Sequence, residues 1–235
     1  MENNVSASNA NFLQNFINVF FSPRQTMESI DRNPKWVLPF LVMLIIILLF
    51  TMVTINISLK EQLPKQRVKM EEKGMSDEQI DNAMEMGQKI GKIIGPISAL
   101  VASAAFTAIM ALIIWFMGNI VLGGLTSFKK VFTVYIYSSF ISILGMIIKI
   151  PLILQKETMD VNFSLASFFN PDNMNKYFYA FMKSVEVFEV WRFVVLAIGF
   201  AVVYKFSMKK SAWAMFALFV IYVVIMTFVY ASQLG

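Results

Sequence analysis

The chain has 235 residues, of which 57% are hydrophobic and only 15% charged, with a formal net charge of +5. Soluble domains are about half apolar and about a quarter charged, so this composition indicates an integral membrane protein. The chain has no cysteine and no histidine, which excludes thiol chemistry, disulfides, Cys/His zinc sites and imidazole catalysis. No stripe of basic and aromatic residues suits a nucleic acid, so we expect no nucleic-acid partner. We also expect no cofactor.

Residues 1–35 are predicted to form a polar N-terminal tail, over residues 1–10, and two short interfacial helices. In the first helix, apolar side chains recur at spacings of three and four, which predicts one apolar face on the membrane surface: Phe12, Leu13, Phe16, Ile17, Phe20 and Phe21. Ser22 suits the N-cap of the second helix, Pro23 its first position and Gln25 the reciprocal cap. We expect the pair to anchor the entry to the first span, with partner docking as the alternative.

Residues 36–235 are predicted to form an all-α, polytopic membrane domain. Its apolar runs give five transmembrane helices, each long enough to cross about 30 Å of hydrocarbon. The spans are expected at about residues 36–59, 97–122, 131–154, 188–206 and 212–231. The first run starts too far along the chain, and is too long, for a signal-peptide core, so we expect insertion through the first span.

A polar segment, residues 60–92, separates the first two spans and is predicted to form an extramembrane helical hairpin. Gly74 can end its first helix, and Ser76 with Gln79 matches a capping box that starts the second. We expect the hairpin to pack on the ends of the spans, with partner binding as the alternative.

Few polar residues fall inside the later spans. The second span is expected to start at Pro96 and end at Gly123-Gly124, and Asn119 is its most polar group. We expect Asn119 to make a hydrogen bond between helices, with a transport ligand as the alternative. Lys149 lies near the end of the third span, from which its ammonium group can reach the headgroups. The loop over residues 155–184 is rich in Phe and Tyr, which predicts an interfacial position, and contains a turn signal at 170–172.

The fourth span begins with the charged residues Glu186, Glu189 and Arg192. Successive steps of three residues turn a helix by about 60°, so the three side chains would share a face of about 120° on which Glu189 and Arg192 can pair. One interpretation is an ion pair anchored at the interface, with Arg192 reaching the headgroups or pairing with Glu189. The other is a polar contact with a partner span or a lipid phosphate.

The distribution of basic residues predicts the orientation of the spans. Eight Lys and Arg residues lie in the N-terminal segment and the loops after the second and fourth spans, and none lies in the C-terminal tail. The positive-inside rule therefore places the N-terminus in the cytoplasm and the C-terminus outside. The hairpin at 60–92 argues against this orientation, because it puts seven basic residues outside.

Three segments together resemble the bacterial branch of the Yip (Ypt/Rab-interacting protein) family: FFSPRQTMESIDRNPKWVLP, LGGLTSFKKVFTVYIYSSFISILG and VEVFEVWRFVVLAIGFAVVYKFSMKKSAW. The resemblance implies a five-span helical fold, a cytoplasmic N-terminus, a bacterial cytoplasmic membrane and no established enzymatic activity. We do not expect this chain to bind small GTPases, because a bacterial protein has no such partners and the N-terminal segment of this chain is only about 35 residues long.

A non-enzymatic scaffold or adaptor, binding membrane lipids, other membrane proteins or itself, fits the small-residue helix faces and interfacial aromatic residues. A small-solute or lipid transporter, or a transporter accessory subunit, is the alternative; its candidate polar contacts are Glu186, Glu189, Arg192, Asn119 and Lys149. An intramembrane enzyme is disfavoured, since histidine is absent and every Asp lies outside the predicted spans.

Overall fold

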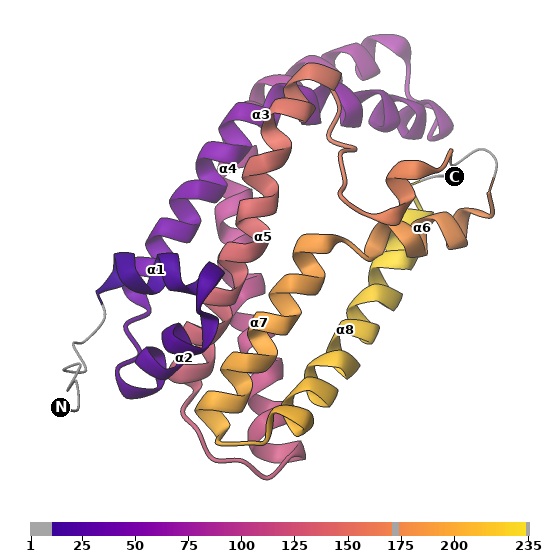
Figure 1. Cartoon of the computed structure of the whole chain (residues 1–235). Coiled ribbons are helices and arrows are strands. Elements are labelled where there is room, and N and C mark those ends of the chain that lie inside the picture. Colours follow the sequence, from indigo (N-terminus) through magenta and orange to yellow (C-terminus); the bar gives the residue numbers. More distant parts are fainter. Residues whose placement is uncertain (1–10, 171–173, 234–235) are drawn as a thin grey trace, which may run out of the picture. The chain divides into compact units, whose positions relative to one another are not determined.

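The computed structural model describes residues 11–170 and 174–233, and this part of the chain is almost entirely helical (Figure 1). Its helices are α1 (Phe12–Phe21), α2 (Pro23–Arg32), α3 (Val37–Glu72), α4 (Asp77–Phe116), α5 (Phe128–Lys156), α6 (Lys176–Ser184), α7 (Val187–Tyr204) and α8 (Met208–Ala231). A π-helical turn, η1 (Met117–Val121), continues α4, and a 3-10 turn, η2 (Leu165–Phe168), precedes α6.

Five of these helices, α3, α4 with η1, α5, α7 and α8, are long and apolar enough to cross a membrane, which confirms the five expected spans and the all-α class. The predicted tail at residues 1–10 lies outside the described residues, as does most of the turn predicted at 170–172. The chain folds into two compact units. The first unit combines residues up to 43 with residues 107–144 and all residues from 162 on, and the second unit combines residues 44–106 with 145–161.

In the second unit, α3 and α4 each run past the apolar span, so the predicted hairpin is made of their polar ends. The connection is short, and Gly74 takes a positive φ of 74° there, a conformation that glycine adopts without steric cost. The capping box is present: the Ser76 amide donates to Gln79 Oε1 at 3.1 Å, and the Gln79 amide donates to Ser76 Oγ at 3.4 Å. Pro96 does not start a helix as expected but lies inside α4, as proline can in membrane helices.

Close packing between α3 and α4 depends on glycines four residues apart. A Cβ atom at Gly91 would lie 2.7 Å from a methyl group of Leu59, and one at Gly95 would lie 2.8 Å from the end of Ile55. Small residues at this spacing let membrane helices approach closely, because no side chain separates the backbones. Both glycines lie before the second span as predicted at 97–122, so the close approach begins ahead of that predicted span.

In the first unit, the N-terminal half of α5 is the central element. Between Val131 and Ile141 nearly every side chain is buried, as expected for a helix surrounded on all sides. Ser138 and Ser139 are accommodated because their hydroxyls donate to backbone carbonyls one turn back, at 2.9 and 2.8 Å.

The N-terminal helices α1 and α2 are packed into the same unit. The Phe16 ring meets the Phe140 ring of α5 edge-on, with centroids 4.9 Å apart, and Met27 lies against Gly199 of α7. Pro23 occupies the first position of α2 as predicted, but the Ser22 side chain makes no capping bond. Gln25 does not cap in return, because its Oε1 accepts from Asn18 of α1 at 3.5 Å.

The helices α7 and α8 are antiparallel neighbours joined by a tight turn (Figure 1). Lys205 ends α7 in the left-handed conformation, with φ 57°, and Ser207 caps α8 by accepting from the Lys210 amide at 3.2 Å. The short helix α6 packs against α8, with Tyr179 and Met182 buried. Its Phe178 and Phe181 remain exposed, as a segment in the interface would leave them.

Candidate functional site

The Glu189–Arg192 pair predicted from the sequence is present near the start of α7, inside the first unit. Arg192 Nη2 lies 2.6 Å from Glu189 Oε2, and Nη1 donates to the hydroxyl of Tyr135 on α5 at 3.2 Å. The side chains are only 9% and 14% exposed to solvent. The guanidinium group therefore does not extend along α7 toward the headgroups; it turns into the helix bundle and links α7 to α5.

This arrangement makes the pair a buried ionic contact. Removing a guanidinium group from water costs several kcal/mol, which the carboxylate and the tyrosine hydroxyl only partly offset. Arg192 Nε and Glu189 Oε2 have no hydrogen-bond partner of acceptable geometry among the described residues. The pair therefore retains hydrogen-bonding capacity within an otherwise apolar helix junction.

Glu186 does not share a helical face with this pair, contrary to expectation. It precedes the first helical residue of α7 and has an extended backbone, with ψ 141°. Its Oε1 accepts from the Phe163 amide at 3.1 Å, and the Val187 amide donates to the Phe163 carbonyl at the same distance. The function of Glu186 is thus to hold the loop segment at 163–164 against the start of α7.

Asn119 also differs from expectation, because it does not bond to another span. Its Nδ2 donates at 3.0 Å to the carbonyl of Thr126, in the loop that follows its own helix. Trp115 Nε1 donates to the same carbonyl at 3.0 Å. The π-helical turn ends at Val121, close to the span end predicted at Gly123-Gly124, and Gly123, with φ 66°, turns the loop back onto the helix end. Lys149 is partly buried in the second unit.

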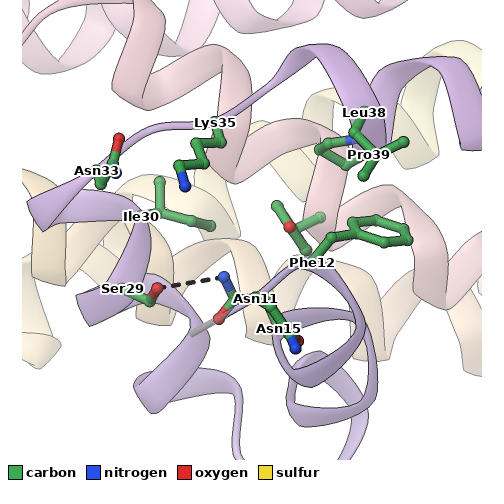
Figure 2. Close-up of a pocket in the computed structure, with 10 residues that line it drawn as sticks. Asn11, Phe12, Asn15, Ser29, Ile30, Asn33, Lys35, Leu38 and Pro39 are labelled. Carbon is green, nitrogen blue, oxygen red and sulfur yellow. Dashed lines mark hydrogen bonds between the residues drawn. The ribbon is translucent and has the colours of Figure 1, made fainter. Parts of the chain in front are cut away.

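A cavity beside α1 and α2, lined by both polar and apolar side chains, has no counterpart in the sequence predictions (Figure 2). It measures about 220 Å³ and is lined by Asn11, Phe12, Asn15, Ser29, Ile30, Asn33, Lys35, Leu38, Pro39 and Tyr137. Asn15 Nδ2 donates to Ser29 Oγ at 3.2 Å, whereas the buried Asn15 Oδ1 has no hydrogen-bond partner. The three asparagines are scattered among the apolar residues of the N-terminal segment, so no local pattern marks them as one site.

A second feature that the sequence did not reveal is a cluster of charges at one end of the first unit. Asp31 of α2 accepts from Lys130 of α5 at 2.7 Å and also from Lys205 at the end of α7. Burial by itself would raise the pKa of the Asp31 carboxyl, but the two ammonium groups outweigh burial and hold this pKa below its ordinary value of 3.8. Asp31 therefore joins three helices through a charged carboxylate.

Replacing Asp31 by asparagine should lower the unfolding free energy by about 1 kcal/mol near neutral pH. The sign of the pH effect follows from the lowered pKa: the stabilisation is complete above the ordinary pKa and is lost as pH falls through the lower, folded value. Wild-type protein should thus lose stability between about pH 5 and about pH 3 more than Asp31→Asn does. Thermal unfolding in detergent micelles across this range measures the difference, and parallel curves for the two proteins would contradict it.

The polar groups on these helices link helices to one another and line one cavity. Among the described residues no cluster of three or more Asp, Glu, His or Cys residues could hold a metal ion. The Glu189–Arg192 pair and the Asp31 cluster are ionic contacts between helices, and the cavity at Asn15 offers hydrogen-bonding groups and one lysine. Their chemistry suits recognition of a charged or hydrogen-bonding group.

Comparison with known proteins gives one match. The sequence profile of the Yip1 domain matches residues 17–231, which is nearly the whole chain and all five candidate spans. No curated protein and no solved structure matches the chain.

Proposed function

Because the chain belongs to the Yip1 domain family and is an integral membrane protein, we propose that it is a non-enzymatic scaffold or adaptor that binds other membrane proteins. The proposed location is the bacterial cytoplasmic membrane, with the N-terminus in the cytoplasm and the C-terminus outside. Small GTPases are not among the proposed partners. Membrane lipids and a second copy of the chain are the other proposed binding partners.

The observation that supports this proposal best is a pair of apolar grooves along α8. One groove, of about 370 Å³, lies between α7 and α8 and is lined by residues such as Phe193, Ala197 and Met215. The other, of about 380 Å³, lies between α6 and α8 and includes Phe181 and Val223. Both include Phe216 and Phe219 of α8. These grooves therefore offer apolar side-chain pockets to a partner helix.

The outer surface of α8 fits a helix-binding role. Phe216, Val220, Val224 and Phe228 are 43–62% exposed and recur every four residues, which places them in one row along the helix. Membrane helices associate through van der Waals packing of such surfaces, because lipid tails and side chains are equally apolar. This row of protruding side chains, beside two grooves, can interlock with the side chains of a partner helix.

The proposed orientation is supported by where the basic residues gather. Lys130 and Lys205 meet at Asp31, and Lys210 Nζ donates to the Leu122 carbonyl at 2.9 Å. The basic loops after the second and fourth spans therefore share one end of the first unit with α2. The positive-inside rule assigns that end to the cytoplasm.

Site-specific photo-crosslinking in native membranes tests the scaffold. A benzophenone amino acid at Phe216, Val220 or Val224 should give discrete protein adducts, identified by mass spectrometry. The matched control is Val101 of α4, which is 65% exposed and lines neither groove. Adducts that are absent at all α8 positions, or equally abundant at Val101, would contradict the proposal. Solute flux into proteoliposomes above that of empty vesicles would favour the transporter alternative instead.

A further inference from the structure

The cavity at Asn15 has the features of a built binding site. Its lining residues come from α1, α2, the linker at 33–35, the start of α3 and Tyr137 of α5, all within the first unit (Figure 2). Asn33, Lys35 and Leu38 on its rim are exposed, so the cavity opens at the entry to the first span. Asn15 and Ser29 lie deeper and are buried.

Two polar groups of the cavity lack partners. Asn15 is only 8% exposed, and its Nδ2 is bonded to Ser29 while its Oδ1 accepts no hydrogen bond. A buried acceptor without a donor has lost its hydrogen bonds to water and gained none in return, so its persistence points to a ligand that supplies the donor. Lys35 forms no ion pair with any described residue and brings one positive charge to the rim. The cavity thus suits a ligand that carries one anionic group and one hydrogen-bond donor.

We propose that this cavity binds the headgroup of a glycerophospholipid that carries a hydrogen-bond donor, such as glycerol or ethanolamine. The single charge of a phosphodiester matches the single ammonium group of Lys35, and the headgroup hydroxyl or ammonium donates to Asn15 Oδ1. The cavity volume of about 220 Å³ equals the liquid volume of about seven water molecules. That is room for a phosphodiester with a short headgroup.

The surroundings of the cavity favour a lipid over a soluble phosphodiester. Leu13 of α1, and Val37, Leu38 and Leu41 at the start of α3, are 50–61% exposed next to the rim residues in the sequence. In the membrane these side chains face acyl chains, so a lipid whose headgroup enters the cavity can lay its own chains along them without leaving the bilayer. A soluble phosphodiester would not be held beside the cavity in this way.

Native mass spectrometry of the full chain, purified in detergent and titrated with lipids, tests the headgroup chemistry. Phosphatidylglycerol and phosphatidylethanolamine should bind about tenfold more tightly than phosphatidylcholine, whose headgroup has no donor for Asn15 Oδ1. Equal binding of the three lipids would overturn the proposal, since it describes ordinary annular lipid. Glycerophosphoglycerol that binds as tightly as phosphatidylglycerol would overturn the assignment to a lipid.

Two variants with matched controls locate the site. Lys35→Gln should weaken all three lipids by about tenfold, while Lys129→Gln, another exposed lysine, should change nothing. Asn15→Leu should abolish the preference over phosphatidylcholine, whereas Gln14→Leu, at an exposed residue of α1 that does not line the cavity, should keep it. Identical effects of the two lysine variants would overturn the proposal. The result is independent of the proposed scaffold, because crosslinks at Phe216 can fail while headgroup selectivity persists.

Discussion

Replacing Arg192 by leucine is expected to lower the unfolding free energy by about 3 to 5 kcal/mol and to reduce the amount of protein in the membrane. The substitution leaves the Glu189 carboxylate, only 14% exposed, without its counter-charge, and it removes the donor to the Tyr135 hydroxyl. The cost is larger than that of a lost surface ion pair because neither remaining group can regain water. Unfolding by sodium dodecyl sulfate in mixed micelles measures the change.

A double substitution separates the burial of the charge from the loss of side-chain volume. In Arg192→Leu with Glu189→Leu no uncompensated charge remains, so the double variant should be more stable than Arg192→Leu alone. Arg32→Leu is the control, because this exposed residue of α2 should cost less than about 0.5 kcal/mol. A double variant as unstable as Arg192→Leu would show that packing, not charge, dominates. A double variant that folds normally but loses a bound lipid or partner would assign the pair a contact function.

The features that could be predicted from the sequence are those set by neighbouring residues. Apolar runs gave the five spans, because crossing the bilayer requires a minimum helix length. The capping box at Ser76 and Gln79 and the end of the second span near Gly123-Gly124 depend on two to four consecutive residues. Glu189 and Arg192 pair across one helical turn, so helical spacing alone brought them together.

The features that could not be predicted depend on contacts between distant segments. Asp31 meets Lys130 and Lys205 across 99 and 174 residues of chain, and no local pattern relates them. Asn119 Nδ2 bonds to the loop after its own helix because a π-helical turn redirects the helix end, and that turn has no sequence signature. The predicted face that Glu186 shares with Glu189 and Arg192 assumes that Glu186 is helical. The hydrogen bonds to Phe163 hold this stretch of backbone outside the helix.

The contact between the end of α4 and the end of α7 predicts the second large effect. A Cβ atom at Gly118 would lie 2.1 Å from Cζ of Tyr204, and the ring has little room to move. It stacks on Phe206 with centroids 5.4 Å apart, and its hydroxyl donates to the Trp115 carbonyl at 3.2 Å. Gly118→Ala should therefore lower the unfolding free energy by about 3 kcal/mol, the upper end of what overpacking costs, in the same SDS titration.

The cause of this loss can be checked by giving the new methyl group space. Tyr204→Leu removes the ring that Gly118→Ala would strike, so the double variant should recover part of the stability relative to the sum of the two single changes. Gly87→Ala is the matched control, because its nearest neighbour, a methyl group of Leu63, would lie at an ordinary 3.7 Å. Alanine there should be neutral or stabilise α4 by up to about 1 kcal/mol, since it restricts the unfolded chain. Equal losses of unfolding free energy in Gly118→Ala and Gly87→Ala would contradict this explanation. They would mean that glycine is needed for helix flexibility at both positions, and not for the close approach of the Tyr204 ring.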